Sequence, residues 1–188
     1  MKDQYLINMR FAEELLRFLQ WETPLLFGFE TRWDPKLAIL EFGKQINVSL
    51  FREEIGWSVF YIINENVDDI VACYEEFLNE MHAPTDDIDN ANFTRCALKI
   101  APLFFPEGYN HGAFLGYCAL VMGVAYNFLL LKPNCIPQLA CQVIGLVLFM
   151  HQMTGEFYEE GGWEGFLDVS LDFNKCMEDL QKKRERKH

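Results

Sequence analysis

The chain has 188 residues, of which 51% are hydrophobic and 23% are charged, so it is long enough to bury a substantial core as a single domain, residues 1–188. Its formal net charge of −12 argues against a general nucleic-acid binder, because phosphate contacts require a basic surface. The six cysteines show no Cys-x-x-Cys spacing, which is typical of a protein from a reducing compartment, and we expect a cytoplasmic protein.

Residues 5–20 are expected to form the first helix, with Ile7, Phe11, Leu15 and Phe18 on its apolar face. Polar side chains form a second stripe, which predicts a surface helix; they are Arg10, Glu13, Glu14, Arg17 and Gln20. Glu13 and Arg17 have the spacing of an ion pair. Residues 21–35 are interpreted as a connection, and residues 36–60 as a helix despite their β-branched side chains.

Two amphipathic helices are predicted in the middle of the chain, over 67–81 and 92–105. In the first, Ile70, Tyr74, Phe77 and Met81 recur on one face; in the second, the recurring residues are Phe93, Ala97, Ile100 and Phe104. Pro84 is expected to end the first helix, and Thr85-Asp86-Asp87 to cap a short turn. Pro106-Glu107-Gly108 would end the second helix, and Asn110 would cap the next one.

Two apolar runs, residues 113–131 and 135–150, are joined by Lys132-Pro133-Asn134 and predict a tight helical hairpin of about 111–131 and 135–152. A helix that is hydrophobic all round lies either in lipid or at the centre of a globule. Because amphipathic segments surround the hairpin, we expect it to lie at the centre of a globule. A final helix is expected over 167–183, so the predicted fold class is all-α.

Residues 159–166 read Glu-Glu-Gly-Gly-Trp-Glu-Gly-Phe. This motif, placed after an apolar hairpin, resembles the second homology region of the Bcl-2 family of apoptosis regulators, Glu-x-Gly-Gly-Trp-Asp-x-Phe. Residues 110–113, Asn-His-Gly-Ala, match half of the family's first region, Asn-Trp-Gly-Arg, and residues 70–77 are similar to the third region, Leu-x-x-x-Gly-Asp-x-Phe, but lack its glycine. The resemblance, which covers about residues 66–180, implies a Bcl-2-like helical bundle in which Gly161, Gly162, Trp163 and Phe166 are structural.

The resemblance further implies a hydrophobic surface groove that binds the BH3 helices of pro-apoptotic partners. The lining residues would be Ile70, Tyr74, Phe77, Phe93, Ala97, Ile100, Phe104, Asn110, His111, Gly112, Ala113, Leu115 and Gly116. Ala113 stands where the family has an arginine that pairs with a ligand aspartate, so Arg95, Lys99 or His111 would have to replace it. Taken alone, a stripe such as Ile70, Tyr74 and Phe77 is more often plain core than groove wall.

The function that the resemblance implies is that of an anti-apoptotic regulator that sequesters BH3 helices. The alternatives are a pro-apoptotic pore former that permeabilises the mitochondrial outer membrane, and an integral membrane hairpin unrelated to the family. The basic tail, residues 182–188, is of the kind that precedes a membrane anchor, which would place the protein at the mitochondrial outer membrane if an anchor was removed. The four histidines have no metal-ligand spacing and no catalytic motif occurs, so we expect no enzyme, metal or cofactor.

Overall fold

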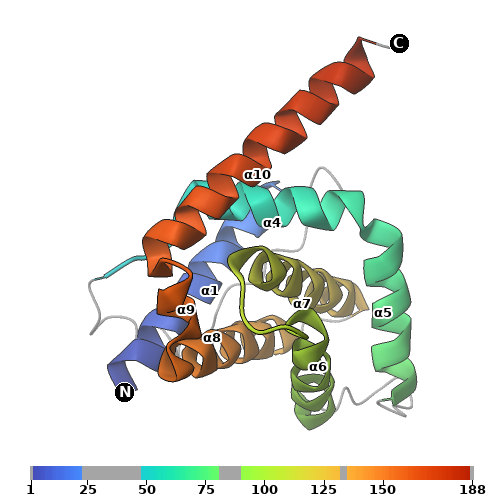
Figure 1. Cartoon of the computed structure of the whole chain (residues 1–188). Coiled ribbons are helices and arrows are strands. Elements are labelled where there is room, and N and C mark those ends of the chain that lie inside the picture. The colour runs from blue at the N-terminus through green and yellow to red at the C-terminus, as the bar shows by residue number, and fades with distance from the viewer. Residues whose placement is uncertain (1, 23–47, 81–89, 132–134, 187–188) are drawn as a thin grey trace.

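The computed structural model describes residues 2–22, 48–80, 90–131 and 135–186, and within these ranges the chain is helical without a strand (Figure 1). Its helices are α1 (Lys2–Glu22), α4 (Glu53–Glu65), α5 (Val67–Glu80), α6 (Asn90–Phe104), α7 (His111–Leu131), α8 (Ile136–Thr154), α9 (Glu156–Glu159) and α10 (Gly162–Glu185). The all-α prediction is therefore confirmed. The expected connections at 23–35, 84–87 and 132–134 lie outside the described residues.

Helix α7 lies at the centre of the bundle, as its apolar sequence predicts. Its largest side chains, among them Phe114, Tyr117 and Phe128, are fully buried. Between His111 and Phe128 only one stripe is partly or fully open to solvent, and it consists of Gly112, Ala113, Gly116, Leu120 and Asn127. A helix buried on nearly all sides needs no polar face, which explains why this run carries no charged residue.

Helix α8 packs against α7, α6 and, most extensively, α1. Gly145 permits the close approach to α1, because a Cβ at this position would lie 3.1 Å from the Met9 backbone nitrogen. Within the described residues, α8 is long and apolar enough to cross a membrane by length and composition alone. In the bundle, 56% of its most apolar window is buried against protein.

Helix α1 is more deeply buried than its sequence suggests. It contacts both α8 and α4, so side chains on two of its faces are covered. Glu13 is only 7% exposed, and the expectation that it belongs to a solvated stripe is wrong. Burial raises the pKa of Glu13 to about 7, although nearby Arg17 acts in the opposite direction.

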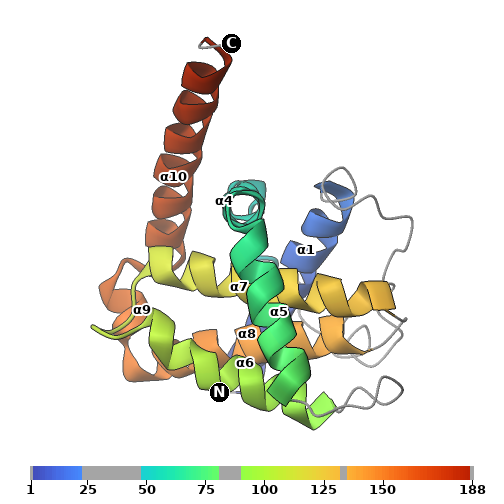
Figure 2. The same ribbon diagram turned by 90° about the vertical axis from the view of Figure 1, so that its right-hand side faces the viewer.

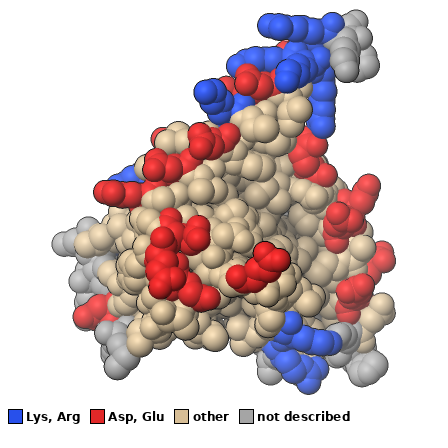
Figure 3. Space-filling view, viewed as in Figure 1, with Lys and Arg blue, Asp and Glu red and all other residues tan. Residues whose placement is uncertain are grey.

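Helix α10 packs across α4 and then extends beyond the bundle (Figures 1 and 2). Ser58 of α4 anchors the crossing: its hydroxyl oxygen lies 2.8 Å from Oδ1 of Asn174, whose side-chain amide donates to the Glu54 carbonyl at 2.7 Å. The projecting end of α10 carries a basic tip, which we define as Lys182, Lys183, Arg184 and Arg186 (Figure 3). Arg184 forms a two-pronged ion pair with Glu65 of α4, with distances of 2.8 and 3.0 Å.

Candidate functional site

The first turn of α7 is capped as the sequence predicts. The side-chain oxygen of Asn110 accepts a hydrogen bond from the backbone amide of Ala113 at 2.7 Å. This bond satisfies one of the free amides at the helix start, and the Asn110 side chain remains exposed. The cap fixes where α7 begins and therefore where its half-exposed stripe begins.

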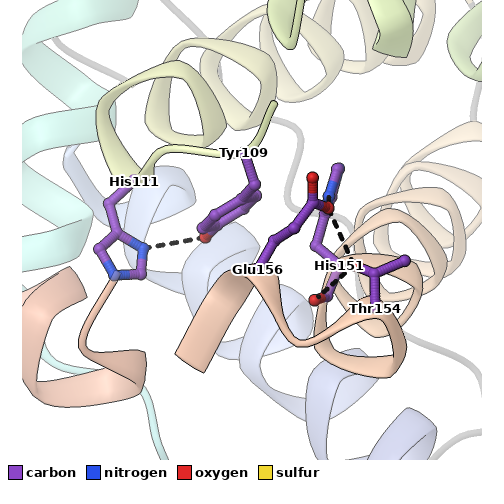
Figure 4. Close-up of polar contacts among 5 residues, drawn as sticks. All are labelled: Tyr109, His111, His151, Thr154 and Glu156. Carbon is purple, nitrogen blue, oxygen red and sulfur yellow. Dashed lines mark hydrogen bonds and ion pairs between the residues drawn. The ribbon is translucent and has the colours of Figure 1, made fainter. Parts of the chain in front are cut away.

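His111, the next residue, is held on both sides of its ring (Figure 4). Its Nδ1 atom lies 2.9 Å from the hydroxyl of Tyr109, and its Nε2 atom lies 2.9 Å from the backbone carbonyl oxygen of Glu160. A carbonyl can only accept, so Nε2 carries the proton, and Nδ1 accepts from the tyrosine hydroxyl. The neutral imidazole satisfies both contacts, and burial lowers the pKa of His111, which favours that neutral form.

These contacts correct the expectation that His111 could replace the arginine. Its side chain is 1% exposed. Because both ring nitrogens are already bonded, His111 cannot replace the missing arginine at position 113. It serves instead as a structural link between α7 and the turn that precedes α10.

A second polar cluster, which the sequence does not reveal, lies at the end of α8 (Figure 4). Nδ1 of His151 lies 2.7 Å from a carboxylate oxygen of Glu156, and the Thr154 hydroxyl donates to the same oxygen at 2.8 Å. The hydrogen bond from His151 has the largest effect on the pKa of Glu156 and lowers it, and the bond from Thr154 acts in the same direction. The rings of Phe105 and Tyr109 pack on His151 with centroids 4.6 and 4.8 Å away, so the cluster joins α8 to the segment before α7.

The Glu-Glu-Gly-Gly-Trp-Glu-Gly-Phe segment forms the turn into α10. Gly161 and Gly162 have φ values of 92° and 62°, which L side chains rarely adopt, so the glycines permit the turn as expected. Trp163 is half-buried and packs on Phe11 of α1 and Phe157 of α9, with ring centroids 5.0 and 5.3 Å away. The ring therefore stabilises the junction of α1 with the turn, and Phe166 is fully buried.

The structure divides the thirteen residues proposed for the groove into three groups. The buried residues belong to the core; they are Ile70, Phe77, Phe93, Ala97, His111 and Leu115. The half-buried residues are Tyr74, Ile100, Phe104, Ala113 and Gly116, and the exposed ones are Asn110 and Gly112. In this arrangement the buried six have no surface to offer a partner, so the accessible part of the set lies on α6 and at the start of α7, apart from the half-buried Tyr74 on α5.

Two aromatic contacts and one close approach explain why the three α5 residues proposed for the groove, Ile70, Tyr74 and Phe77, are largely covered. Phe77 packs on Phe93 of α6 and Tyr74 on Phe128 of α7, with ring centroids 5.7 and 4.9 Å apart. Ile70 lies against Gly123, where a Cβ would come within 2.8 Å of the isoleucine Cγ2. Helix α5 is thus closed onto the second half of α7.

The stripe on the first half of α7 remains partly open, and we call Gly112, Ala113, Gly116 and Leu120 the α7 stripe. Phe104 of α6 borders it, since a Cβ on Gly116 would lie 3.3 Å from the phenyl ring. Figure 2 looks onto this part of α7, with α6 below it and α5 crossing its second half. The sequence analysis missed two accessible apolar residues, Leu120 of the stripe itself and Leu103 of α6, which is 76% exposed.

The charged side chains are unevenly distributed over the face on which α7 begins (Figures 1 and 3). The face in Figure 3 carries acidic side chains around a broad uncharged area, with basic side chains on α6 and on the tip of α10. Arg95 and Lys99, the other proposed replacements for the missing arginine, are both exposed and lie one helical turn apart on α6. An acidic group on a bound helix would therefore meet its nearest cations on α6 and not at the start of α7.

Comparisons with protein-family models, curated proteins and solved structures found no match. The class that the structure defines is an all-helical bundle with a buried central helix. Within the described residues no group of histidine, cysteine and acidic side chains is arranged to hold a metal ion.

Proposed function

We propose that this protein is a Bcl-2-like regulator that binds an amphipathic BH3 helix of a pro-apoptotic partner along the α7 stripe and so inhibits cell death. The observation that carries the proposal is the exposure pattern of α7, a central helix open to solvent along one stripe of two glycines, an alanine and a leucine. Small residues allow a partner backbone to approach closely, Phe104 of α6 borders them at Gly116, and the exposed Leu103 on the same helix adds apolar surface.

The element order supports the same proposal. The motif of residues 159–166 resembles the family's second homology region, and its Glu160 carbonyl accepts a hydrogen bond from His111 at the start of α7. The segments that resemble the family's first and second regions are therefore in contact. Their contact fixes the exposed end of the α7 stripe.

The proposed groove is narrower than the one inferred from the sequence. Ile70, Phe77 and Phe93 lie in the core, so a helix would contact Ile100, Leu103 and Phe104 of α6 together with the α7 stripe. With Ala113 in place of an arginine, the ligand aspartate would lack its two-pronged partner, and a charged group left without one costs free energy. We therefore expect a selective binder with Arg95 or Lys99 as the substitute cation.

The test is a titration of fluorescein-labelled BH3 peptides against wild-type protein and a Gly112→Arg variant. A Cβ on Gly112 would have only the Asn110 side chain within 4 Å, at 3.4 Å, so the substitution should leave the fold intact and block the stripe. Met153→Arg is the matched control, because Met153 is 57% exposed on α8 and away from the stripe. At least a tenfold loss of affinity in Gly112→Arg alone supports the proposal, whereas equal affinities for all three proteins contradict it.

One observation favours a second function, that of a pore former. Helix α8 has the length and composition of a membrane span, and the bundle would have to open to release it. A dye-leakage assay with liposomes separates the two functions. Release of dye when an activating BH3 peptide is added favours the pore, and inhibition of release caused by a known pore-forming protein favours the inhibitor.

A further inference from the structure

An apolar cavity lies between α6 and α8, apart from the α7 stripe. Its volume is about 440 Å³, and it is lined by Leu98, Ala101, Pro102, Phe105, Leu146, Val147, Met150 and His151. Leu98 and Pro102 are four residues apart and share one side of α6. Phe105, three residues further on, directly follows the helix. Ile100 and Phe104, which face the proposed groove, lie on another side of the same helix.

The cavity has the size and composition of a small-molecule site. Pockets for such ligands range from about 300 to 1,000 Å³ and combine apolar walls with a few placed polar groups. Seven of the eight lining residues here are apolar, and His151 is the exception. The ligand must therefore be mostly apolar, with its polar group near His151.

The chemistry of His151 defines that polar group. Its Nδ1 atom is bound to the ionised carboxylate of Glu156, so Nδ1 carries the proton. The other ring nitrogen, Nε2, is then a hydrogen-bond acceptor in the neutral imidazole, and it is the polar atom that His151 can offer to the cavity. A hydroxyl donates to such an atom, whereas a second carboxylate near Glu156 would meet like charge.

Pro102 lies inside α6 and has no amide hydrogen, so the carbonyl of Leu98, four residues earlier, lacks its usual helical donor. Both residues line the cavity, and its lining contains no lysine or arginine. The cavity therefore combines apolar walls with the acceptor on His151.

We propose that the α6–α8 cavity is a binding site for an aliphatic alcohol, whose chain fills the apolar volume and whose hydroxyl donates to His151. The occupant is a small molecule and not a partner helix, because His151 is the one polar side chain among the residues that line the cavity and can place a single polar group. This site is independent of the α7 stripe and of the function proposed for it.

The first experiment is calorimetric titration with 1-octanol, with backbone amide shifts as the map of the site. We expect saturable binding to the wild-type protein, with shifts at residues such as Leu98, Ala101 and Met150. Met150→Trp should fill the cavity from its rim and abolish binding, whereas Met153→Trp should not. The two methionines are a matched pair, since they lie one turn apart on α8 and are 56% and 57% exposed.

The second experiment compares 1-octanol with 1-methoxyheptane, which has the same number of heavy atoms and no donor. A single hydrogen bond corresponds to about fivefold in affinity, so the alcohol should bind about five times more tightly. His151→Phe keeps an aromatic ring between Phe105 and Tyr109 and should remove this preference. Absence of saturable binding, binding that survives Met150→Trp, or equal affinities for the two probes in the wild type would overturn the proposal.

Discussion

Nε2 of His111 and the backbone carbonyl oxygen of Glu160 lie 2.9 Å apart although 49 residues separate them in the chain. The bond ties the first turn of the buried helix α7 to the residue before the Gly161–Gly162 turn. Tyr109 completes the arrangement from the other side of the ring, and its own side chain is only 6% exposed. The neutral imidazole satisfies both contacts, and burial favours that form by lowering the pKa of His111, so the stability of the link should respond to substitution and to pH.

Replacing His111 with glutamine should lower the free energy of unfolding by roughly 2 kcal/mol at pH 7.5, because two buried hydrogen bonds are disturbed. The pKa of native His111 is lowered by burial, so below about pH 6.5 the unfolded chain takes up the proton first. The wild type therefore loses more stability in acid than the variant, and the difference between them narrows. Urea unfolding of both proteins at pH 7.5 and 5.5 measures the difference in their free energies of unfolding. A difference that is larger at pH 5.5 than at pH 7.5 would contradict the prediction.

The contribution of Glu13 to stability depends on pH in the opposite direction to that of His111. Burial raises its pKa from an ordinary value of 4.5 to about 7, so its contribution to stability is fully present below pH 4.5 and is lost as the pH rises through 7. Its Oε1 atom has no hydrogen-bond partner in the described part of the chain. Glu13→Gln should therefore raise the free energy of unfolding by about 2–3 kcal/mol at pH 8 and hardly at pH 4.5. Asp3→Asn, on the exposed start of the same helix, should show no such gain; equal effects of the two would refute this role for Glu13.

Two glycines should respond to alanine in opposite directions. A Cβ on Gly165 would collide with the Glu160 carbonyl oxygen, which is backbone and cannot move aside. Gly165→Ala should therefore destabilise the protein by about 3 kcal/mol. Gly112 is exposed and helical, so Gly112→Ala should stabilise by roughly 0.5 kcal/mol. Chemical denaturation of both variants tests the prediction, which fails if Gly165→Ala is neutral.

The contact of Ile70 with Gly123 should be visible as non-additivity. Gly123→Ala would bring a methyl group within 2.8 Å of Ile70, at a cost of about 1–3 kcal/mol, and Ile70→Ala alone should cost about 2–4 kcal/mol. In the double variant the new methyl group occupies space that the isoleucine has left. Its loss of stability should be smaller than the sum of the single losses by at least about 1 kcal/mol. If the loss of stability in the double variant equals the sum of the two single losses, the prediction is wrong, and Ile70 and Gly123 do not interact energetically.

The sequence predicted most helices well because their signals are local, but the expected helix over 36–60 is wrong in its bounds: residues 48–52 are not helical, and α4 runs from Glu53 to Glu65. The apolar run from 113 to 131 carries no charge, and Asn110 and Gly161–Gly162 mark a cap and a turn through the chemistry of single residues. The structure bears out each of these assignments. The predicted final helix begins earlier than expected, at Gly162, because the two glycines form the entry to it.

The site was predicted less well because its features depend on packing between distant segments. The period of Ile70, Phe77 and Phe93 identifies an apolar face but not that another helix covers it. In the same way, the spacing of Glu13 suggests a polar stripe, yet α8 and α4 cover two faces of α1. His111 and His151 depend on partners that no periodicity connects to them. No local pattern indicates that Leu103 is left uncovered.

The projection of α10 gives the molecule a strong electrical polarity. Four cations, Lys182, Lys183, Arg184 and Arg186, lie at the projecting end of α10, whereas the charged side chains on the visible face of the body are mostly acidic (Figure 3), so the centres of positive and negative charge are separated. A negatively charged surface would repel the body and attract the end of α10 within about one Debye length. The protein would then approach such a surface in one preferred orientation, with α10 first.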